Sequence, residues 1–258
     1  MMNSMVAVIP TGMIICCIDA IDRVFLRVIR VYECMLCPIT QHHHNSCKNK
    51  GDDENTDAMV EHMSHQLSSY AVINRGWERS DSVDFLKDKA DCNNIYQCKE
   101  DVVREEFLDP IIRFKNKILR TSQIAYIFYI HGMSNRHRVI SKDPYLDVVV
   151  GYGAGKPNSF SCDMWQKNML LHHLNQSGIT SYEGKAGGAM SGWSRNNLNQ
   201  YFRKWDYDAN VSSMQLEVIY ELRHDKDLAI ITADYMANAI SDLVDAKNFY
   251  DNSVYKSY

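Results

Sequence analysis

Two residues that can transfer protons or bind metals stand inside apolar segments of this sequence. His131 directly follows the apolar and aromatic run 126–130, and Glu217 lies in the mainly apolar run 214–219. Burying a carboxylate is costly unless it is paired, hydrogen-bonded or protonated, and burial raises its pKa toward the range useful for general acid–base catalysis. A neutral imidazole can hold a metal ion. The structural alternatives are a histidine that caps a buried strand and a glutamate on the wet face of an edge strand.

A second group of metal-binding residue types lies near the amino terminus. Cys34 and Cys37 form a C-x-x-C pair, and Cys47 follows three consecutive histidines at 42–44. Such residues can hold zinc, but this segment lacks the second pair that structural zinc sites of this kind commonly use. We therefore interpret the cluster as incidental.

The glycine-rich loop GYGAGK, residues 151–156, follows a predicted strand and raises the question of phosphate binding. A P-loop requires a glycine where this chain has Val150, and a serine or threonine where it has Pro157. The sequence therefore favours a tight turn over a nucleotide-binding site.

Helices and strands are predicted to alternate along most of the chain. This alternation indicates an α/β fold with a mainly parallel or mixed sheet and helices on both faces. The chemistry of such folds lies at the carboxyl ends of the strands, and His131 is predicted at one such end. The predicted helices cover 56–69, 109–119, 159–177, 196–205 and 226–246, and the predicted strands cover 70–74, 124–131, 145–151 and 212–222.

The first 50 residues differ in character from the rest. Within 19–37, arginines recur at helical intervals opposite valines, which predicts an amphipathic helix, and a polar linker follows it. We therefore expect an atypical extension over 1–50 and one α/β domain over 51–258.

The bulk composition narrows the classes of partner and compartment. The 258 residues include 28 basic and 32 acidic side chains, a formal net charge of -4, so a nucleic acid partner is not expected. The eight cysteines are irregularly spaced, which favours reduced thiols in a cytoplasmic protein. An apolar run of about 18 residues is absent from the sequence, so neither a membrane span nor a membrane partner is expected.

Four motifs occur in a particular order along this chain. They are YAVINRGWER, ADCNN, YIHGM followed by RHR and LDVVVGYGAG, and MQLEVIYELR. In this order they resemble the N-formylglutamate amidohydrolase family, which is similar in fold to zinc carboxypeptidases and aspartoacylases. The resemblance covers roughly 52–243 and leaves residues 1–50 outside it.

The resemblance implies one zinc ion held by two histidines and a carboxylate, with an open position for water. His131 matches the histidine ligand that ends a central strand, and Glu217 matches the catalytic glutamate in the Q-x-E strand of the family. Zinc would lower the pKa of its bound water and polarise the amide carbonyl, while the glutamate moves a proton to the leaving amine.

The first metal-binding motif of the family, a histidine followed closely by Glu or Asp, has a different form here. Lys50 and Gly51 stand where the histidine is expected. The resemblance therefore implies Glu54 as the carboxylate ligand and His44, or one of its two neighbours, as a histidine that reaches in from upstream. The alternative is a catalytically degenerate member that binds a carboxylate ligand without hydrolysis.

Substrates of this family carry a carboxylate, for which arginine is a bidentate partner. The implied function is a metal-dependent amidohydrolase that cleaves the amide bond of a small, carboxylate-bearing N-acyl amino acid, such as an N-formyl one, or of a peptide-like substrate. The family often has an arginine where this chain has Asn94, so the choice of substrate stays open. The expected substrate-binding residues are Arg75, Arg79, Asn93 and Arg138.

Overall fold

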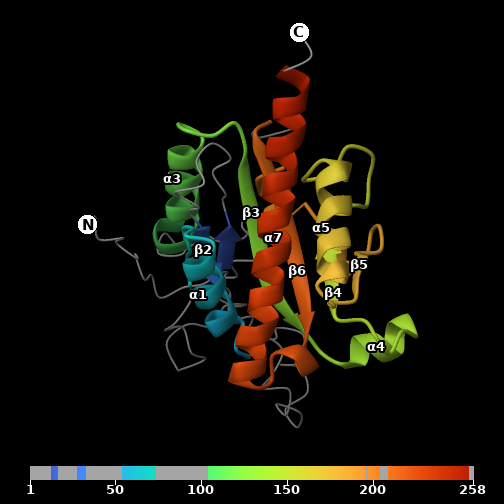
Figure 1. Ribbon diagram of the computed structural model, residues 1–258. Helices are drawn as coiled ribbons and strands as arrows, with labels where there is room; N and C mark the ends of the chain where they lie inside the picture. Colours follow the sequence, from blue (N-terminus) through green and yellow to red (C-terminus); the bar gives the residue numbers. More distant parts are fainter. Residues whose placement is uncertain are drawn as a thin grey trace.

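The structure, a computed structural model, is an α/β fold built on a mixed sheet (Figure 1). The four strands lie in the order β3 (Ala125–Met133), β6 (Val211–Ile219), β4 (Val148–Gly151) and β5 (Ser181–Glu183). β3 and β6 are parallel, whereas β4 is antiparallel to β6 and parallel to β5. The expected fold class is confirmed. The structure describes residues 13–16, 28–32, 54–73, 104–195, 197–203 and 209–255, with the backbone alone for 13–16, 28–32, 106–107 and 247–255.

The strand that carries His131 is buried on both faces along its whole length. Its aromatic and β-branched residues 126–130 suit a pleated surface. A strand covered on both sides contains a continuous apolar run instead of an alternating pattern. The double burial of β3 therefore explains the composition of this segment.

Three helices cover one face of the sheet (Figure 1). Their apolar side chains form a single core cluster with strand residues such as Phe128 and Leu216. Met59, Met63 and Leu67 follow one another at helical spacing, and all three are buried in this cluster. The three helices are α1 (Thr56–Gln66), α5 (Met164–Gln176) and α7 (Lys226–Tyr255).

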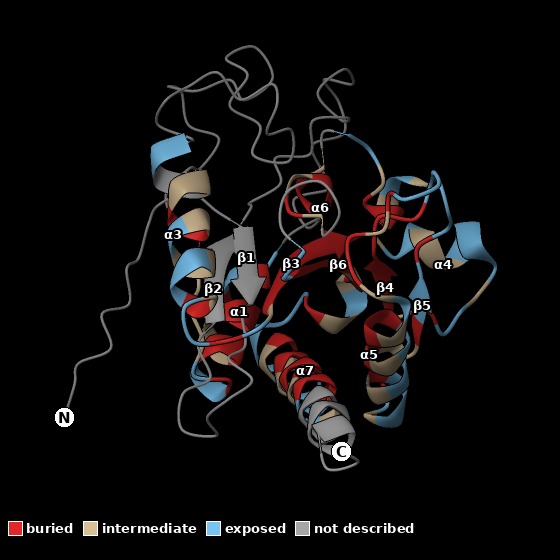
Figure 2. Ribbon diagram, turned by 90° about the horizontal axis from the view of Figure 1, so that it is seen from above, coloured by how far each residue is buried: buried red, intermediate tan, exposed pale blue. Residues whose placement is uncertain are grey.

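The opposite face of the sheet carries α3 (Asp109–Ile118) and α6 (Leu198–Tyr201). Ile111 of α3 and Leu198 of α6 belong to a second core cluster, which includes Ile127 of β3. Figure 2 shows α6 on one side of the sheet and α5 and α7 on the other. Helices on both faces were expected, and this expectation is confirmed.

The side chain of Asn175, in α5, bonds to the first residue of the outer strand β5. The backbone N–H of Ser181 donates to Asn175 Oδ1 at 2.9 Å. The Ser181 carbonyl accepts from Asn175 Nδ2 at 3.3 Å, and its hydroxyl oxygen accepts from the same nitrogen at 3.0 Å. Asn175 therefore satisfies backbone groups at the start of the strand.

Two predictions for the amino-terminal half were wrong. Residues 28–32, which were predicted within a helix, form strand β2 (Val28–Tyr32), paired antiparallel with β1 (Met13–Cys16). Val28, Ile29 and Val31 are β-branched and favour a strand over a helix. β1 contacts β3. The expected boundary at residue 50 stays a prediction.

The segment 71–73, which was expected to form most of the strand 70–74, lies outside the sheet although Val72 and Ile73 are buried. Their apolar side chains fill the core without a backbone ladder, so hydrophobicity alone overpredicted a strand here. Other elements differ from expectation at their ends, and α7 continues well beyond residue 246. The remaining short elements are the π-helical turn Arg104–Leu108, α4 (Arg136–Ser141) and the 3-10 turns Ala189–Ser191 and Tyr220–Leu222.

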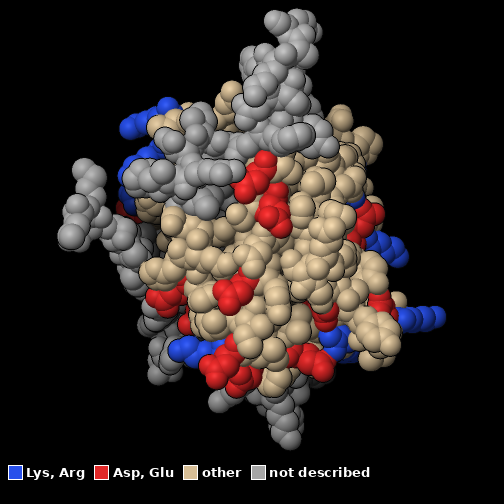
Figure 3. All heavy atoms as spheres, viewed as in Figure 1, with Lys and Arg blue, Asp and Glu red and all other residues tan. Residues whose placement is uncertain are grey.

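Charges are unevenly distributed on the helical face of the molecule. Figure 3 shows acidic side chains over the middle of this face and basic ones mainly toward its margins. The described residues of this face therefore present no basic stripe of the kind that binds nucleic acid. Within the described ranges, no helix combines the length and apolar character needed to cross a membrane.

Candidate functional site

His131 and Glu217 are direct neighbours across two parallel strands. The register of β3 and β6 pairs His131 with Glu217 and, two residues earlier, Tyr129 with Gln215. All four belong to the sheet face opposite α1, α5 and α7, because side chains alternate along a strand. The pair lies close to the carboxyl ends of β3 and β6, where α/β folds commonly place their chemistry.

His131 is 4% exposed, and among the described residues its Nδ1 has no hydrogen-bond partner. Buried polar atoms in proteins are nearly always paired, so this nitrogen is a candidate for a bond to a group that the described residues do not supply. Burial lowers the pKa of His131 from 6.5 to about 4, because a low-dielectric environment disfavours the imidazolium ion. The ring is therefore neutral at pH 7, which is the state that binds metal ions. β3 continues to Met133, so His131 does not end the strand as expected.

Glu217 is partly buried in an interior strand. β6 lies between β3 and β4, so the alternative of a glutamate on an edge strand is wrong. Side chains alternate along this strand, and Met214, Leu216 and Val218 lie in the core cluster under the helices. Glu217 Oε1 accepts a hydrogen bond of 3.0 Å from Gln215 Nε2, on the same face of the strand.

A chain of side-chain amides reaches Glu217 from the loop before α6. Asn197 Nδ2 donates to Gln215 Oε1 at 2.9 Å. Gln215 Nε2 donates to the Met190 carbonyl at 3.1 Å as well as to Glu217. Neither Gln215 nor Asn197 was among the site residues expected from the sequence. The only sequence signal for Gln215 is its position two residues before Glu217, and Asn197 has no such signal because it comes from a distant loop.

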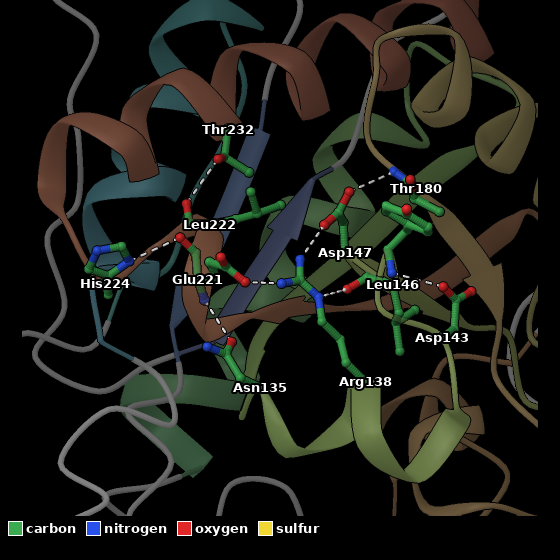
Figure 4. Close-up of polar contacts among 11 residues, drawn as sticks. Asn135, Arg138, Asp143, Leu146, Asp147, Thr180, Glu221, Leu222, His224 and Thr232 are labelled. Atoms are coloured by element: carbon green, nitrogen blue, oxygen red, sulfur yellow. Dashed lines mark hydrogen bonds and ion pairs between the residues drawn. The ribbon is translucent and has the colours of Figure 1, made fainter.

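Arg138, an expected substrate-binding residue, is bonded to protein groups (Figure 4). Its Nη2 donates to Asp147 Oδ1 at 2.8 Å, its Nε donates to the Leu146 carbonyl at 2.9 Å, and its Nη1 bonds to Glu221. Asp147 also accepts from the Thr180 backbone N–H at 2.9 Å. Arg138 thereby ties α4 to the start of β4 and to the turn after β6, and its part in substrate binding stays a prediction.

A buried arginine brings the expected ligand Glu54 close to the end of β3. Arg223 is fully buried, and its Nη1 donates to the Glu54 carbonyl at 2.9 Å. Its Nη2 lies 3.4 Å from the Met133 carbonyl, and its Nε donates to the Val218 carbonyl at 3.2 Å. The Glu54 side chain is exposed, so the structure brings its backbone, not its carboxylate, into contact with the strand ends.

Several predicted site residues lie outside the described ranges. They are His44, Arg75, Arg79, Asn93 and the cysteine and histidine cluster of 34–47. Within the described ranges, no group of three or more histidine, cysteine, aspartate or glutamate side chains has the geometry to hold a metal ion. The structure therefore brings together His131 and Glu217 and leaves the other metal and substrate assignments as predictions.

The class of protein defined by the fold is an α/β protein with a mixed sheet and a polar pair at the carboxyl ends of its parallel strands. No protein-family model and no curated protein matches the chain. Among solved structures it is similar to an N-formylglutamate amidohydrolase from Ralstonia eutropha, with 13% identity, a TM-score of 0.40 and coverage of 55% of this chain and 52% of that chain.

Two further solved structures are similar. A gene product of Agrobacterium tumefaciens has 8% identity and a TM-score of 0.47, with coverage of 77% of this chain and 79% of that one. A protein assigned as a carboxypeptidase A from Shewanella denitrificans has 12% identity and a TM-score of 0.43, with coverage of 75% and 55%. The chain spans about half the length of the amidohydrolase and of the carboxypeptidase. These values are too low to assign the chain to a family.

Proposed function

We propose that this protein is a hydrolase that cleaves the amide bond of a small, carboxylate-bearing N-acyl amino acid. The observation that carries the proposal is the pairing of His131 with Glu217 on one sheet face near the carboxyl ends of two parallel strands. A buried neutral imidazole beside a partly buried carboxylate supplies a metal ligand and a proton acceptor in one place.

We propose His131 as one ligand of a zinc ion, because its buried, unpartnered Nδ1 fits that role. Glu54 and His44 are the proposed further ligands. A bound zinc ion would supply a water of lowered pKa and a polarised amide carbonyl. The backbone of Glu54 lies near the end of β3, which is compatible with this assignment, although its carboxylate is exposed.

Glu217 is the proposed proton carrier. Its carboxylate would accept a proton from the attacking water and deliver it to the leaving nitrogen, a role that requires hydrogen-bond reach to both. The N–H of Gln215 that binds Glu217 Oε1 is a charge-assisted donor and fixes the direction of this oxygen. Glu217 can therefore act from one orientation throughout the reaction.

The carboxylate of the substrate requires a positive partner outside the pair. We propose Arg75 and Arg79, with Asn93, for this role. Arg138 is the weaker candidate, because its guanidinium already bonds to Asp147, Glu221 and the Leu146 carbonyl.

The experiment that tests the proposal measures hydrolysis of N-formyl and N-acetyl amino acids by zinc-loaded protein. Glu217→Gln is expected to lower kcat/KM by about 100-fold or more, because the proton carrier is lost. His131→Asn is expected to reduce the bound zinc measured by elemental analysis. The exposed Glu105→Gln serves as a matched control and should keep the wild-type rate. A wild-type rate in Glu217→Gln would remove Glu217 from the mechanism.

A second candidate function is suggested by the sequence, because Lys50 and Gly51 stand where the resemblance to the amidohydrolase family places its first histidine ligand. In this alternative the protein binds a carboxylate ligand and does not hydrolyse it. Calorimetric binding of N-formyl amino acids in the presence of a chelator, without turnover when zinc is added, would support the alternative. Turnover that depends on added zinc would exclude it.

A further inference from the structure

The amide chain between Asn197 and Glu217 has a fixed polarity. At one end, Asn197 Oδ1 accepts the backbone N–H of Asn199 at 2.8 Å, as the N-cap of α6. A backbone N–H can only donate, so the oxygen of Asn197 must face it and the NH₂ group must face Gln215. The orientation of Asn197 is therefore set by the helix that it caps.

The other end of the chain fixes Gln215 in the same way. The Met190 carbonyl can only accept, so the NH₂ group of Gln215 must face it, at 3.1 Å. Its oxygen then accepts from Asn197 at 2.9 Å, and its second N–H points to Glu217 at 3.0 Å. Backbone groups at both ends thus leave Gln215 one orientation, with a donor aimed at Glu217.

Two glycines leave space for the hydrogen-bonded side chains between the loop and the strand. Gly151 lies opposite Gln215 in the sheet, and a Cβ at Gly151 would lie 2.5 Å from Gln215 Cγ and 2.3 Å from the Met190 oxygen. Gly192 has a φ of +68°, and a Cβ there would lie 2.2 Å from Asn199 Nδ2 and 3.2 Å from Gln215 Oε1. The close approach of the loop to the strand therefore requires residues without side chains at both places.

Other hydrogen bonds, which do not involve the Asn197 and Gln215 amides, attach this loop to the sheet. Asn199 Nδ2 donates to the Gly151 carbonyl at 3.2 Å, and Ser213 Oγ donates to Asn199 Oδ1 at 3.0 Å. Gln200 Nε2 donates to the carbonyls of Ser159 and Gly192 at 3.0 and 2.9 Å. These bonds already hold the loop, whereas the Asn197 and Gln215 amides lead to Glu217.

We infer that Gln215 is a positioning residue for Glu217 and that Asn197 is the residue that sets the direction of the Gln215 amide. The inference rests on the proposed function only for its effect on hydrolysis. The hydrogen-bond arrangement itself can be tested without a substrate.

Asn197→Asp is the sharpest test, because it changes only the group that faces Gln215, from a donor to an acceptor. Aspartate caps helices as well as asparagine does, so the bond to the Asn199 N–H is kept. The group that faces Gln215 becomes an acceptor, and two acceptors then oppose each other, so the Gln215 amide loses the orientation that serves Glu217. Asn197→Ser is the second variant, because serine also caps but is too short to reach Gln215.

The expected result is a fall in kcat of about 10- to 100-fold with KM within about twofold of wild type, because Glu217 is misdirected while substrate binding is kept. Ser213→Ala is the matched control: it removes a buried hydrogen bond of the same loop that does not lead to Glu217, and should keep the wild-type kcat. A wild-type kcat in both Asn197 variants overturns the inference.

The second readout is hydrogen exchange of the Gln215 side-chain amide by ¹⁵N NMR, assigned with Gln215→Glu and compared with the exposed Gln176. Exchange in Asn197→Asp is expected to be at least about tenfold faster than in wild type, and unchanged in Ser213→Ala. If wild type hydrolyses no amide substrate, the proposed function fails and exchange alone decides. Faster exchange then supports the amide chain, and unchanged exchange overturns it.

Discussion

At the scale of single residues, the site depends on a histidine whose surroundings favour the uncharged ring. His131 is buried within β3, and its Nδ1 has no partner in the described part of the chain. A solvated imidazole would be partly protonated near neutral pH, but the desolvated ring of His131 is not. Burial of this ring also means that the folded protein is less stable at acidic pH, because the buried imidazole resists protonation.

Stability should fall in acid because of His131. The unfolded chain has a histidine pKa of 6.5 and the folded chain one of about 4, so between these values the unfolded state binds a proton that the folded state does not. The contribution of His131 to the free energy of unfolding is therefore fully present above pH 6.5, and it decreases as the pH falls toward 4. Between pH 7.5 and 5 the loss from this group is about 2 kcal/mol.

Urea unfolding of metal-free protein at the two pH values measures this loss. His131→Asn should remove it, whereas His224→Asn, at an exposed histidine, should keep it. An equal pH dependence in wild type and His131→Asn would refute the prediction.

At the scale of elements, β6 organises the site because it lies between two strands of opposite direction. Its parallel neighbour β3 sets His131 beside Glu217, and its antiparallel neighbour β4 sets Gly151 beside Gln215. Because Gly151 has no side chain, the Met190 carbonyl can approach the sheet there and accept a hydrogen bond from Gln215. One strand therefore fixes both the His131–Glu217 pair and the loop that packs beside it.

Gly151→Ala should destabilise the protein by about 1–3 kcal/mol, because the added methyl group overlaps the Met190 oxygen and the Gln215 side chain. It should also lower hydrolysis, because both groups hold the loop over Glu217. Gly178→Ala is a control of similar cost, about 1–2 kcal/mol, since Gly178 has a φ of +89° but no neighbour within 4 Å. Thermal unfolding and the rate of hydrolysis separate the two variants. If Gly178→Ala lowers the rate as much as Gly151→Ala does, loss of stability explains both effects.

At the scale of the whole molecule, Arg223 connects parts of the chain that are far apart in sequence. Its guanidinium bonds to carbonyls before α1, at the end of β3 and within β6. A buried arginine that satisfies several backbone acceptors leaves each of them without a donor when it is removed. The Arg223 side chain therefore joins the carboxyl edge of the sheet to the segment that precedes the first helix.

Arg223→Met should lower the free energy of unfolding by about 2–4 kcal/mol, because methionine keeps much of the volume but leaves buried carbonyls unsatisfied. Arg195→Met, at an exposed arginine, should change it by less than about 0.5 kcal/mol. Urea unfolding at pH 7.5 measures both. Equal stabilities for the two variants would show that the Arg223 bonds contribute little.

Part of this structure could be predicted from the sequence, for physical reasons that differ between residues. The apolar run before His131 and the alternation around Glu217 are local patterns, and they correctly placed both residues on strands. Their pairing, the antiparallel direction of β4 and the contact of Asn197 with Gln215 depend on long-range contacts that local patterns do not encode. Residues 28–32 were misassigned because arginines at helical intervals outweighed the β-branched residues between them.

The bond between Asn175 and the outer strand has a consequence for how the protein behaves when crowded. An outer strand with unpaired backbone groups can act as a template on which a second chain deposits, which is one route to aggregation. At Ser181 that position is already occupied by a side-chain amide, which offers a donor and an acceptor as an added strand would. A second chain would have to displace Asn175 before it could pair with Ser181, so this side chain opposes the addition of a strand at the start of β5.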